Sequence, residues 1–272
     1  MLFFIYRVPS LPKNHGVLDL KLFIGESENQ PLVVAFGGSE GGNVWSSDKL
    51  KEIRDQFLQR GYAFLAVGYF GGENTPPYID RISLNAIHDS IISVSNHPRL
   101  SSGKIALFGF SRGGELVLNL ASRYSDINAV IAIVPPNVSL PSKWGSGSKS
   151  SWTFHEVEIP YLSGSNESVQ LIRKVNFYAG FSKMLENKRS VRRSAIEVEK
   201  ITCPMLLLSA TTDKIWPSTF MCDKMVSRLE QNEFQYHFEH IAFAGDHGAP
   251  INNRNIETIF NFLKNQFLQN SD

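Results

Sequence analysis

Five short apolar runs, separated by amphipathic stretches, restrict the possible folds of this chain more than any other feature. The runs are Pro31–Phe36, Tyr62–Val67, Lys104–Phe108, Ala129–Val134 and Met205–Ser209. The stretches after the first three carry apolar residues at the spacing of an amphipathic helix. Strands that are apolar on both faces and alternate with helices are typical of parallel sheets with both faces covered. We therefore predict an α/β protein with a mostly parallel central sheet flanked by helices.

Further elements are predicted around these runs. Apolar residues at every second position over Leu18–Ile24 predict an antiparallel strand that leads into the sheet. Helical spacing predicts a helix over Ile82–Val94. The last part of the chain is predicted to form a helix over Thr219–Leu229, a strand over Gln235–Ile241 and a closing helix over Ile256–Phe267.

The regular alternation breaks between Pro135 and Lys200. This stretch is too long for a simple connection in a compact domain, so it predicts a cap or lid, with a disordered excursion as the alternative. Its many aromatic residues favour burial and therefore the cap. They are Trp144, Trp152, Phe154, Tyr161, Phe177, Tyr178 and Phe181. We expect one domain over residues 1–272, with residues 135–200 as the cap or lid insertion.

Composition excludes several classes of protein. Hydrophobic residues make up 42% of the 272 residues, which is enough for a large core and excludes a disordered or fibrous chain. The 27 Lys and Arg balance 26 Asp and Glu, so no basic excess indicates nucleic acid or an anionic membrane as a partner. Cys203 and Cys222 are too few for a disulfide scaffold and lack the spacing of metal ligands. We expect no metal and no cofactor.

No segment predicts export or insertion into a membrane. The apolar stretch Met1–Tyr6 is shorter than a signal-peptide core, which needs about 7–15 apolar residues. No run reaches the roughly 18 apolar residues of a membrane span. We therefore expect a cytoplasmic protein.

The segment Phe108–Gly114 contains Gly-x-Ser-x-Gly at the junction between an apolar run and an amphipathic helix. In that context the motif forms a nucleophile elbow, a strained turn that exposes a serine hydroxyl. Gly109 and Gly113 leave room beside the turn, which makes Ser111 the predicted nucleophile. The alternative is a glycine-rich turn in which the serine has no chemical role.

A serine hydroxyl is a poor nucleophile at neutral pH, so Ser111 needs a base and a group that orients the base. In this architecture the partners follow in the order Ser, Asp or Glu, His. Asp213 follows the fifth apolar run, and His247 lies between the next predicted strand and the closing helix. Both are therefore predicted at the sheet edge where ligands bind. Asp223 and Asp246 are weaker candidates for the acid. Structural roles in helices, strands, the lead-in or the cap fit the other histidines better: His15, His88, His97, His155, His237 and His240.

The glycine-rich segment Gly37–Gly42 follows the first apolar run and predicts one half of an oxyanion hole. Its glycines let the backbone approach a developing oxyanion closely. The Ser39 amide is the preferred donor from this loop, with Gly38 beside it, and the Arg112 amide supplies the other half. The segment is no phosphate-binding loop, because it lacks the Gly-Lys-Ser/Thr ending and does not enter a helix as Gly-x-Gly-x-x-Gly.

These segments together resemble the C-terminal catalytic domain of the acyl-CoA thioesterase / bile acid-CoA:amino acid N-acyltransferase family, which belongs to the α/β-hydrolases and is close to the dienelactone hydrolases. The resemblance runs from about Pro31 onward. Its most specific parts are the Gly-Gly-Glu-Leu extension of the elbow, residues 113–116, and Val-Glu-Lys-Ile, residues 198–201. Further matching segments are Phe36–Gly42, Gly61–Phe70, His97–Leu100 and Asp213–Pro217.

The resemblance implies an α/β-hydrolase fold. Carried over residue by residue, the family's triad falls on Ser111, Asp213 and His247, and its oxyanion loop falls on Gly38 and Ser39. We also expect three residues of the matching segments to contact the substrate: Gly37, Tyr69 and Trp216.

Two departures from the family pattern are visible. Family members from animals carry a β-sandwich domain before the catalytic one, whereas only residues 1–30 precede the match here. This chain is therefore expected to act as a catalytic domain alone. Members that conjugate amino acids use a cysteine nucleophile, whereas this chain has Ser111, and an acyl-serine favours water as the acceptor.

The expected function is therefore hydrolysis of a small-molecule acyl thioester, of the acyl-CoA or acyl-carrier type, through an acyl-serine intermediate. Three other functions remain open. The first is an acyltransferase that passes the acyl group to an amine or alcohol. The second is a carboxylesterase or dienelactone-type hydrolase, and the third is a binding module without catalytic activity. A complete Ser, Asp, His order argues against the last, because a binding module has no use for all three groups.

Overall fold

The computed structural model describes residues 10–142, 149–249 and 255–269. Within these residues the main sheet has seven strands in the order β1-β3-β2-β5-β6-β9-β10, and every neighbouring pair is parallel except β1 and β3. The strands are β1 (Asp19–Phe23), β2 (Gln30–Phe36), β3 (Ala63–Gly68), β5 (Leu100–Phe110), β6 (Ala129–Ile133), β9 (Met205–Ala210) and β10 (Phe238–Phe243). The predicted α/β fold with its antiparallel lead-in strand is confirmed.

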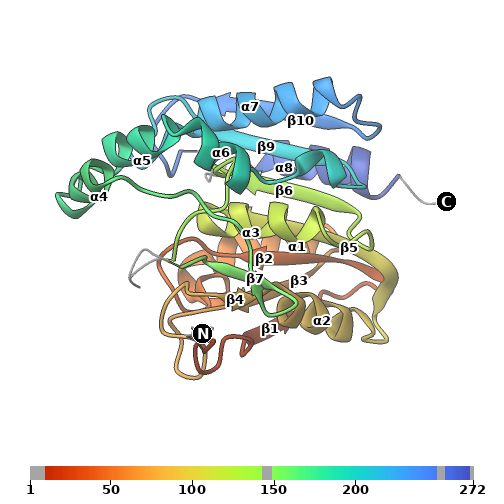
Figure 1. Cartoon of the computed structure of the whole chain (residues 1–272). Coiled ribbons are helices and arrows are strands. Elements are labelled where there is room, and N and C mark those ends of the chain that lie inside the picture. The colour runs from red at the N-terminus through yellow and green to blue at the C-terminus, as the bar shows by residue number, and fades with distance from the viewer. Residues whose placement is uncertain (1–9, 143–148, 250–254, 270–272) are drawn as a thin grey trace, which may run out of the picture.

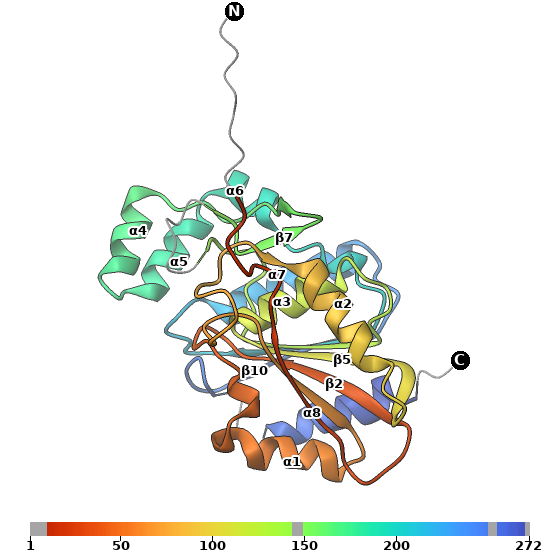
Figure 2. The ribbon, with the colours of Figure 1, turned by 90° about the horizontal axis from the view of Figure 1, so that it is seen from below.

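Helices cover both faces of this sheet, as Figure 1 and Figure 2 show. Figure 2 shows α1 and α8 on one face and α2 and α3 on the other. The helices are α1 (Lys51–Gln59), α2 (Leu84–Ser95), α3 (Arg112–Ala121), α7 (Ser218–Gln231) and α8 (Ile256–Phe262). All residues of β3, β6 and β9 are buried, because side chains on both faces of these central strands pack under helices. Two large clusters of buried side chains result, one on each face of the sheet.

The described residues between 135 and 200 form short elements of their own beside the sheet (Figure 2). These elements are β7 (Trp152–Phe154), β8 (Val157–Glu158), α4 (Asn166–Arg173), α5 (Phe177–Leu185), α6 (Lys188–Ser194) and a 3-10 turn over Val198–Lys200. The strand β7 pairs antiparallel with β8 and in parallel with β4 (Ile82–Ser83), which comes from an earlier part of the chain. The helices α4, α5 and α6 each begin with a side-chain cap, supplied by Ser165, Asn176 and Asn187. Trp152 is fully buried, whereas Trp144 lies outside the described residues. The described part of this stretch is therefore folded, and its role as a lid stays a prediction.

Several predicted boundaries differ from the structure, and three of the differences have a clear physical reason or change the type of element. Ile82 lies in β4, and the helix begins after Ser83, whose hydroxyl accepts a hydrogen bond from the Ala86 amide at 3.1 Å and so caps it. The last strand begins at Phe238, three residues later than predicted, because turn residues follow α7. The closing helix ends as α-helix at Phe262 and continues as a π-helical turn over Leu263–Phe267.

In the described part of the chain no helix is long and apolar enough to cross a membrane. The same residues contain no group of three or more His, Cys, Asp or Glu side chains placed to hold a metal ion. Cys203 and Cys222 are free and buried. Burial raises the pKa of the Cys203 thiol to about 12, so this side chain stays a protonated, unreactive part of the core.

Candidate active site

Ser111 occupies the sharp turn between β5 and α3. Its backbone lies at φ 57° and ψ −115°, a strained conformation for a residue with a side chain. The turn closes tightly: a Cβ on Gly109 would lie 2.1 Å from the Gly113 carbonyl oxygen, and one on Gly113 would lie 2.5 Å from the Gly37 oxygen. The Ser111 amide donates to the Ile133 carbonyl at 2.8 Å, which ties the turn to the neighbouring strand. The elbow predicted from the motif is therefore present in the backbone geometry.

The structure brings Ser111, His247 and Asp213 together in one hydrogen-bonded chain. His247 Nε2 lies 2.9 Å from Ser111 Oγ, and His247 Nδ1 lies 2.8 Å from Asp213 Oδ2. A neutral imidazole has one donor and one acceptor nitrogen. Because the carboxylate accepts from Nδ1–H, Nε2 is left to accept the proton of the Ser111 hydroxyl. This arrangement is the one a base-activated serine needs.

The loop that carries Asp213 orients its carboxylate toward His247. The side chain is almost fully buried, and its Oδ1 accepts hydrogen bonds from the Ile215 amide at 2.8 Å and the Trp216 amide at 3.2 Å. Oδ2 is thereby directed to His247. The His247 ring also packs edge-on against Trp216, with ring centroids 4.9 Å apart, and against Phe110 at 5.4 Å. The imidazole is therefore fixed in place from both of its nitrogens and from its sides.

Three of the competing groups named from the sequence, His240, Asp223 and His88, have partners away from Ser111. His240 Nε2 lies 2.8 Å from Ser209 Oγ, and its Nδ1 lies 3.2 Å from Asp223. Burial lowers the pKa of His240, and the charge of Asp223 only partly opposes this. His88 stacks on Tyr124 and contacts Asp126. These pairs account for both histidines as structural residues.

The glycine-rich loop after β2 lies directly beside the elbow. A Cβ on Gly38 would lie 3.0 Å from Ser111 Cβ, so the loop backbone contacts the serine. The Gly38 amide donates to the Glu40 carboxylate at 2.8 Å and is thus engaged within its own loop. Ser39 and Arg112 keep their place as the predicted oxyanion donors. The carboxylate of Glu40, for which the sequence pattern predicts no role, therefore helps to shape this loop.

Tyr69 stabilises the same loop through hydrogen bonds to its backbone. Its hydroxyl lies 3.0 Å from the Gly37 carbonyl oxygen and 3.1 Å from the Gly38 carbonyl oxygen, and it donates to this pair. The side chain is only 2% exposed. Burial raises the pKa of the Tyr69 phenol well above its usual value, which keeps the hydroxyl protonated as a donor. A contact between Tyr69 and substrate stays a prediction, and the structure adds this bracing bond.

We expect Tyr69→Phe to lower kcat about tenfold, because the loop that carries the Ser39 amide loses its brace while the elbow stays unchanged. The free energy of unfolding should fall by about 1–3 kcal/mol, since two buried carbonyls lose their donor. Ester turnover and urea unfolding measure the two effects. Tyr62→Phe is the matched control, because Tyr62 is equally buried but packs with Phe57 and Phe267 away from the loop. An unchanged kcat in Tyr69→Phe would remove the bracing role.

The side chain of Arg112 turns away from the site into a buried ion pair. Arg112 Nη1 lies 2.8 Å from Glu115 Oε2, one helical turn along α3, and both side chains are at most 4% exposed. Glu115 Oε1 accepts hydrogen bonds from the Leu140 amide at 2.8 Å and from Trp152 Nε1 at 2.6 Å. Burial raises the pKa of the Glu115 carboxyl, and the Arg112 charge opposes that rise. The pair therefore joins the elbow helix to the 135–158 stretch.

A second contact strengthens this joint. Arg112 Nη2 donates to Ser151 Oγ, whose own proton is shared with the Leu140 and Pro141 carbonyls at 3.0 Å. The Arg112 guanidinium also lies 5.8 Å from the Trp152 ring centroid. The sequence pattern predicts a role for the Arg112 amide only and indicates no role at the site for Glu115, Ser151 or Trp152. In the sequence, the signal that could have indicated this ion pair is Glu115 itself, a charged residue in the Gly-Gly-Glu-Leu segment. In the structure every residue of this helix is buried, so its charge requires a partner.

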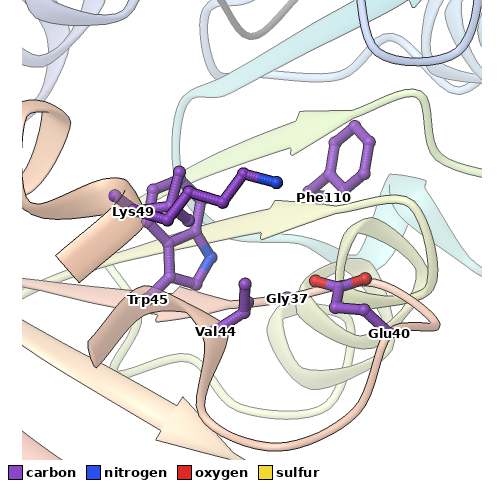
Figure 3. A pocket seen from close by; sticks show the side chains of 7 residues that line it. Gly37, Glu40, Val44, Trp45, Lys49 and Phe110 are labelled. Carbon is purple, nitrogen blue, oxygen red and sulfur yellow. The ribbon is translucent and has the colours of Figure 1, made fainter. Parts of the chain in front are cut away.

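The remaining predicted substrate contacts are Trp216 and Gly37. Trp216 is 2% exposed and donates its indole N–H to the Val134 carbonyl at 3.0 Å. Gly37 borders an apolar pocket together with Phe110 (Figure 3). Contact of either residue with substrate stays a prediction. Lys188, Arg189, Arg192 and Arg193, the basic residues of α6, are exposed to solvent.

Two families of hydrolases match parts of this chain. The family described as "BAAT / Acyl-CoA thioester hydrolase C terminal" matches residues 82–248. The family described as "Alpha/beta hydrolase of unknown function" matches residues 23–140. The first match includes Ser111, Asp213 and His247, and the second includes the loop after β2.

Two curated relatives have sequences similar to this one. Acyl-coenzyme A thioesterase 6 from Homo sapiens is 26% identical over 224 residues, which are 80% of this chain and 49% of the relative. The mitochondrial acyl-coenzyme A thioesterase 2 from Mus musculus is 25% identical over 228 residues, 82% of this chain and 46% of the relative. The chain thus spans about half the length of the curated relatives it matches.

Solved structures with the same fold are more distant in sequence. The structure of DcsB in complex with its substrate analogue superposes with a TM-score of 0.59 at 14% identity, covering 91% of this chain and 93% of that one. Est1E from Butyrivibrio proteoclasticus with bound ferulic acid gives 0.58 at 17% identity, covering 92% and 95%. These similarities support the α/β-hydrolase fold.

Proposed function

The chain belongs to the BAAT / acyl-CoA thioester hydrolase C-terminal family, and from this premise we propose that it hydrolyses an acyl thioester of the acyl-CoA or acyl-carrier type through an acyl-serine intermediate. The single observation that supports the proposal most is the chain of hydrogen bonds from Ser111 through His247 to Asp213. The thioesterase names of the relatives support the thioester as substrate.

In the proposed first step His247 Nε2 takes the proton of Ser111 while Oγ attacks the thioester carbonyl carbon. The negative charge that develops on the carbonyl oxygen is stabilised by the Arg112 amide at the first turn of α3 and by the Ser39 amide. His247 then protonates the leaving sulfur, and the C–S bond breaks to give a thiol and an acyl-serine. Asp213 stabilises the imidazolium and holds its orientation without taking a proton.

In the second step a water molecule attacks the acyl-serine carbonyl. His247 takes a proton from this water and returns it to Ser111 Oγ as the ester bond breaks, so the carboxylic acid leaves and the enzyme is restored. An amine or alcohol in place of water would give acyl transfer by the same route. The serine nucleophile favours water, and the comparison of acceptors below separates the two outcomes.

Mass spectrometry of the protein, both intact and after proteolytic digestion, tests the proposal after mixing with a panel of acyl-CoA thioesters. We expect a mass increase equal to the acyl group on the peptide that contains Ser111, followed by release of free acid. Addition of glycine or taurine should leave the product as the free acid. An amide product would instead establish the acyltransferase, and an adduct on any other residue would contradict the acyl-serine mechanism.

A further inference from the structure

The loop after β2 carries an acid whose carboxylate turns back onto the loop itself. Glu40 Oε1 accepts a hydrogen bond from the Gly38 amide at 2.8 Å, although the Glu40 residue as a whole is exposed to solvent. Figure 3 shows this carboxylate beside Gly37. The amide that it binds belongs to a buried residue, so the carboxylate supplies the acceptor that a buried backbone N–H requires.

Close packing accounts for the two glycines under this carboxylate. Neither Gly37 nor Gly38 has a positive φ, so their backbone conformation does not itself require glycine. A Cβ on Gly37 would lie 2.6 Å from Glu40 Oε1, and one on Gly38 would lie 3.0 Å from Glu40 Oε2. Both positions therefore have to lack a side chain for the carboxylate to bind here.

Hydrogen bonds fix the peptide groups on both sides of Gly38. In the Gly37–Gly38 peptide, Tyr69 donates to the carbonyl oxygen at 3.0 Å and the N–H donates to Glu40. In the Gly38–Ser39 peptide, Tyr69 donates to the carbonyl oxygen at 3.1 Å. A trans peptide directs its N–H and its C=O to opposite sides, and none of the described peptide bonds is cis. The N–H groups of Gly38 and Ser39 are therefore both directed away from Tyr69.

This part of the loop contacts the proposed nucleophile. The Cβ position of Gly38 lies 3.0 Å from Ser111 Cβ. A rotation of the Gly38–Ser39 peptide would redirect the Ser39 N–H, the proposed oxyanion donor of this loop, and would leave the hydrogen bonds of the triad unchanged. An oxyanion donor stabilises the transition state only when it points to the position where the charge develops. The bond between Glu40 and Gly38 is thus placed to control the donor of the loop and not the triad.

We propose that Glu40 is a positioning residue of the oxyanion hole. Its carboxylate holds the Gly38 N–H while Tyr69 holds the two carbonyls, so that the Ser39 N–H faces the oxygen of the reacting carbonyl. The inference rests on the proposed function, because it concerns the charge that forms when Ser111 attacks. In this role Glu40 contacts no reacting atom and exchanges no proton.

Two substitutions at Glu40 test this role. Glu40→Gln keeps an acceptor oxygen for the Gly38 N–H, whereas Glu40→Leu is similar in size and has no acceptor. With the acyl-CoA that the wild type hydrolyses fastest, we expect Glu40→Leu to lower kcat about tenfold and to leave KM within about twofold. This loss is smaller than the roughly 10²–10³-fold loss from removing a donor, because the Ser39 amide remains and is only misaligned. Glu40→Gln should keep the wild-type kcat within about threefold. Glu73→Leu, which replaces another exposed acid in a loop, is the matched control and should keep full activity.

An analogue of the oxyanion intermediate separates alignment of the donor from general damage to the fold. The ketone 1,1,1-trifluorooctan-2-one adds reversibly to a serine hydroxyl, and its oxygen then carries the negative charge. We expect its inhibition constant to rise about tenfold in Glu40→Leu, in parallel with the loss of kcat/KM, and to stay near the wild-type value in Glu40→Gln and Glu73→Leu. An unchanged constant in Glu40→Leu would overturn the positioning role. A lower constant would overturn it too, because the carboxylate would then obstruct the oxyanion hole.

Hydrogen exchange at the Gly38 amide, followed by NMR, tests the contact without turnover. We expect slow exchange in the wild type and in Glu40→Gln, and exchange at least about tenfold faster in Glu40→Leu. A wild type that neither hydrolyses a thioester nor binds the ketone would contradict the proposed function. In that case protection of Gly38 by Glu40 would make the contact purely structural and overturn the inference as well. A Glu40→Leu variant that exchanges and reacts like an active wild type would overturn the inference and leave the proposed function standing.

Discussion

Replacement of Ser111 by alanine is expected to reduce thioester turnover by about four orders of magnitude or more. The hydroxyl that contacts His247 Nε2 at 2.9 Å is the atom that attacks in the proposed reaction, so no acyl-enzyme forms without it. The residual rate reflects substrate binding and the oxyanion donors alone. Steady-state kinetics with an acyl-CoA substrate, together with mass spectrometry for the adduct, measure the effect.

The fold should survive this change. The Ser111 amide bond to Ile133 and the tight glycine contacts of the elbow belong to the backbone, and alanine keeps them. Thermal unfolding of Ser111→Ala should therefore match the wild type within a few degrees. Ser122→Ala, at the end of the same helix, is the control that keeps full activity. Retention of more than about one percent of the turnover in Ser111→Ala would mean that another group is the nucleophile.

Replacement of Glu115 by leucine is expected to lower the free energy of unfolding by about 3–5 kcal/mol. The change leaves the Arg112 guanidinium buried without its counter-charge, and it removes the acceptor of the Leu140 amide and of Trp152 Nε1. Denaturation by urea, monitored by tryptophan fluorescence, measures the loss. Because α3 also carries the Arg112 amide of the proposed oxyanion hole, kcat should fall in the same variant.

The double variant Arg112→Met/Glu115→Leu distinguishes an unpaired charge from a general packing defect. Removing both charges eliminates the cost of the isolated guanidinium, so much of the lost stability should return. Glu197→Leu is the surface control, because its ion pair with Lys200 is exposed and contributes little. If Glu115→Leu destabilised the protein no more than Glu197→Leu, the buried pair would not be what joins the elbow helix to the 135–158 stretch.

The parallel sheet and the chain of Ser111, His247 and Asp213 were accessible from the sequence because each leaves a local signal. Apolar runs mark strands buried on both faces, and the glycines of the elbow mark a turn that tolerates no Cβ beside it. Asp213 and His247 follow strand ends, and parallel strands bring their carboxyl ends to one edge. Position along the chain was therefore sufficient to place these residues together.

Features that depend on contacts between distant segments had no such signal. Nothing near Glu115 in the sequence indicates that Trp152, 37 residues later, donates to its carboxylate. Tyr69 stands at the end of a strand, where a contact with substrate and a bond to the loop after β2 are equally compatible with the pattern. The strand β10 begins three residues later than predicted, because the turn that follows α7 is set by tertiary packing and not by the apolar pattern.

The long separation in sequence between Ser111 and His247 determines the order in which the two residues are synthesised and brought together. His247 follows Ser111 by 136 residues, and Asp213 lies between them. At the usual rate of synthesis of about 5–20 residues per second, the serine leaves the ribosome many seconds before its base. Under the proposed mechanism, Ser111 is therefore synthesised well before the base that would activate its hydroxyl. Reactivity toward thioesters would then be acquired only once β10 has joined the sheet and His247 has reached Ser111.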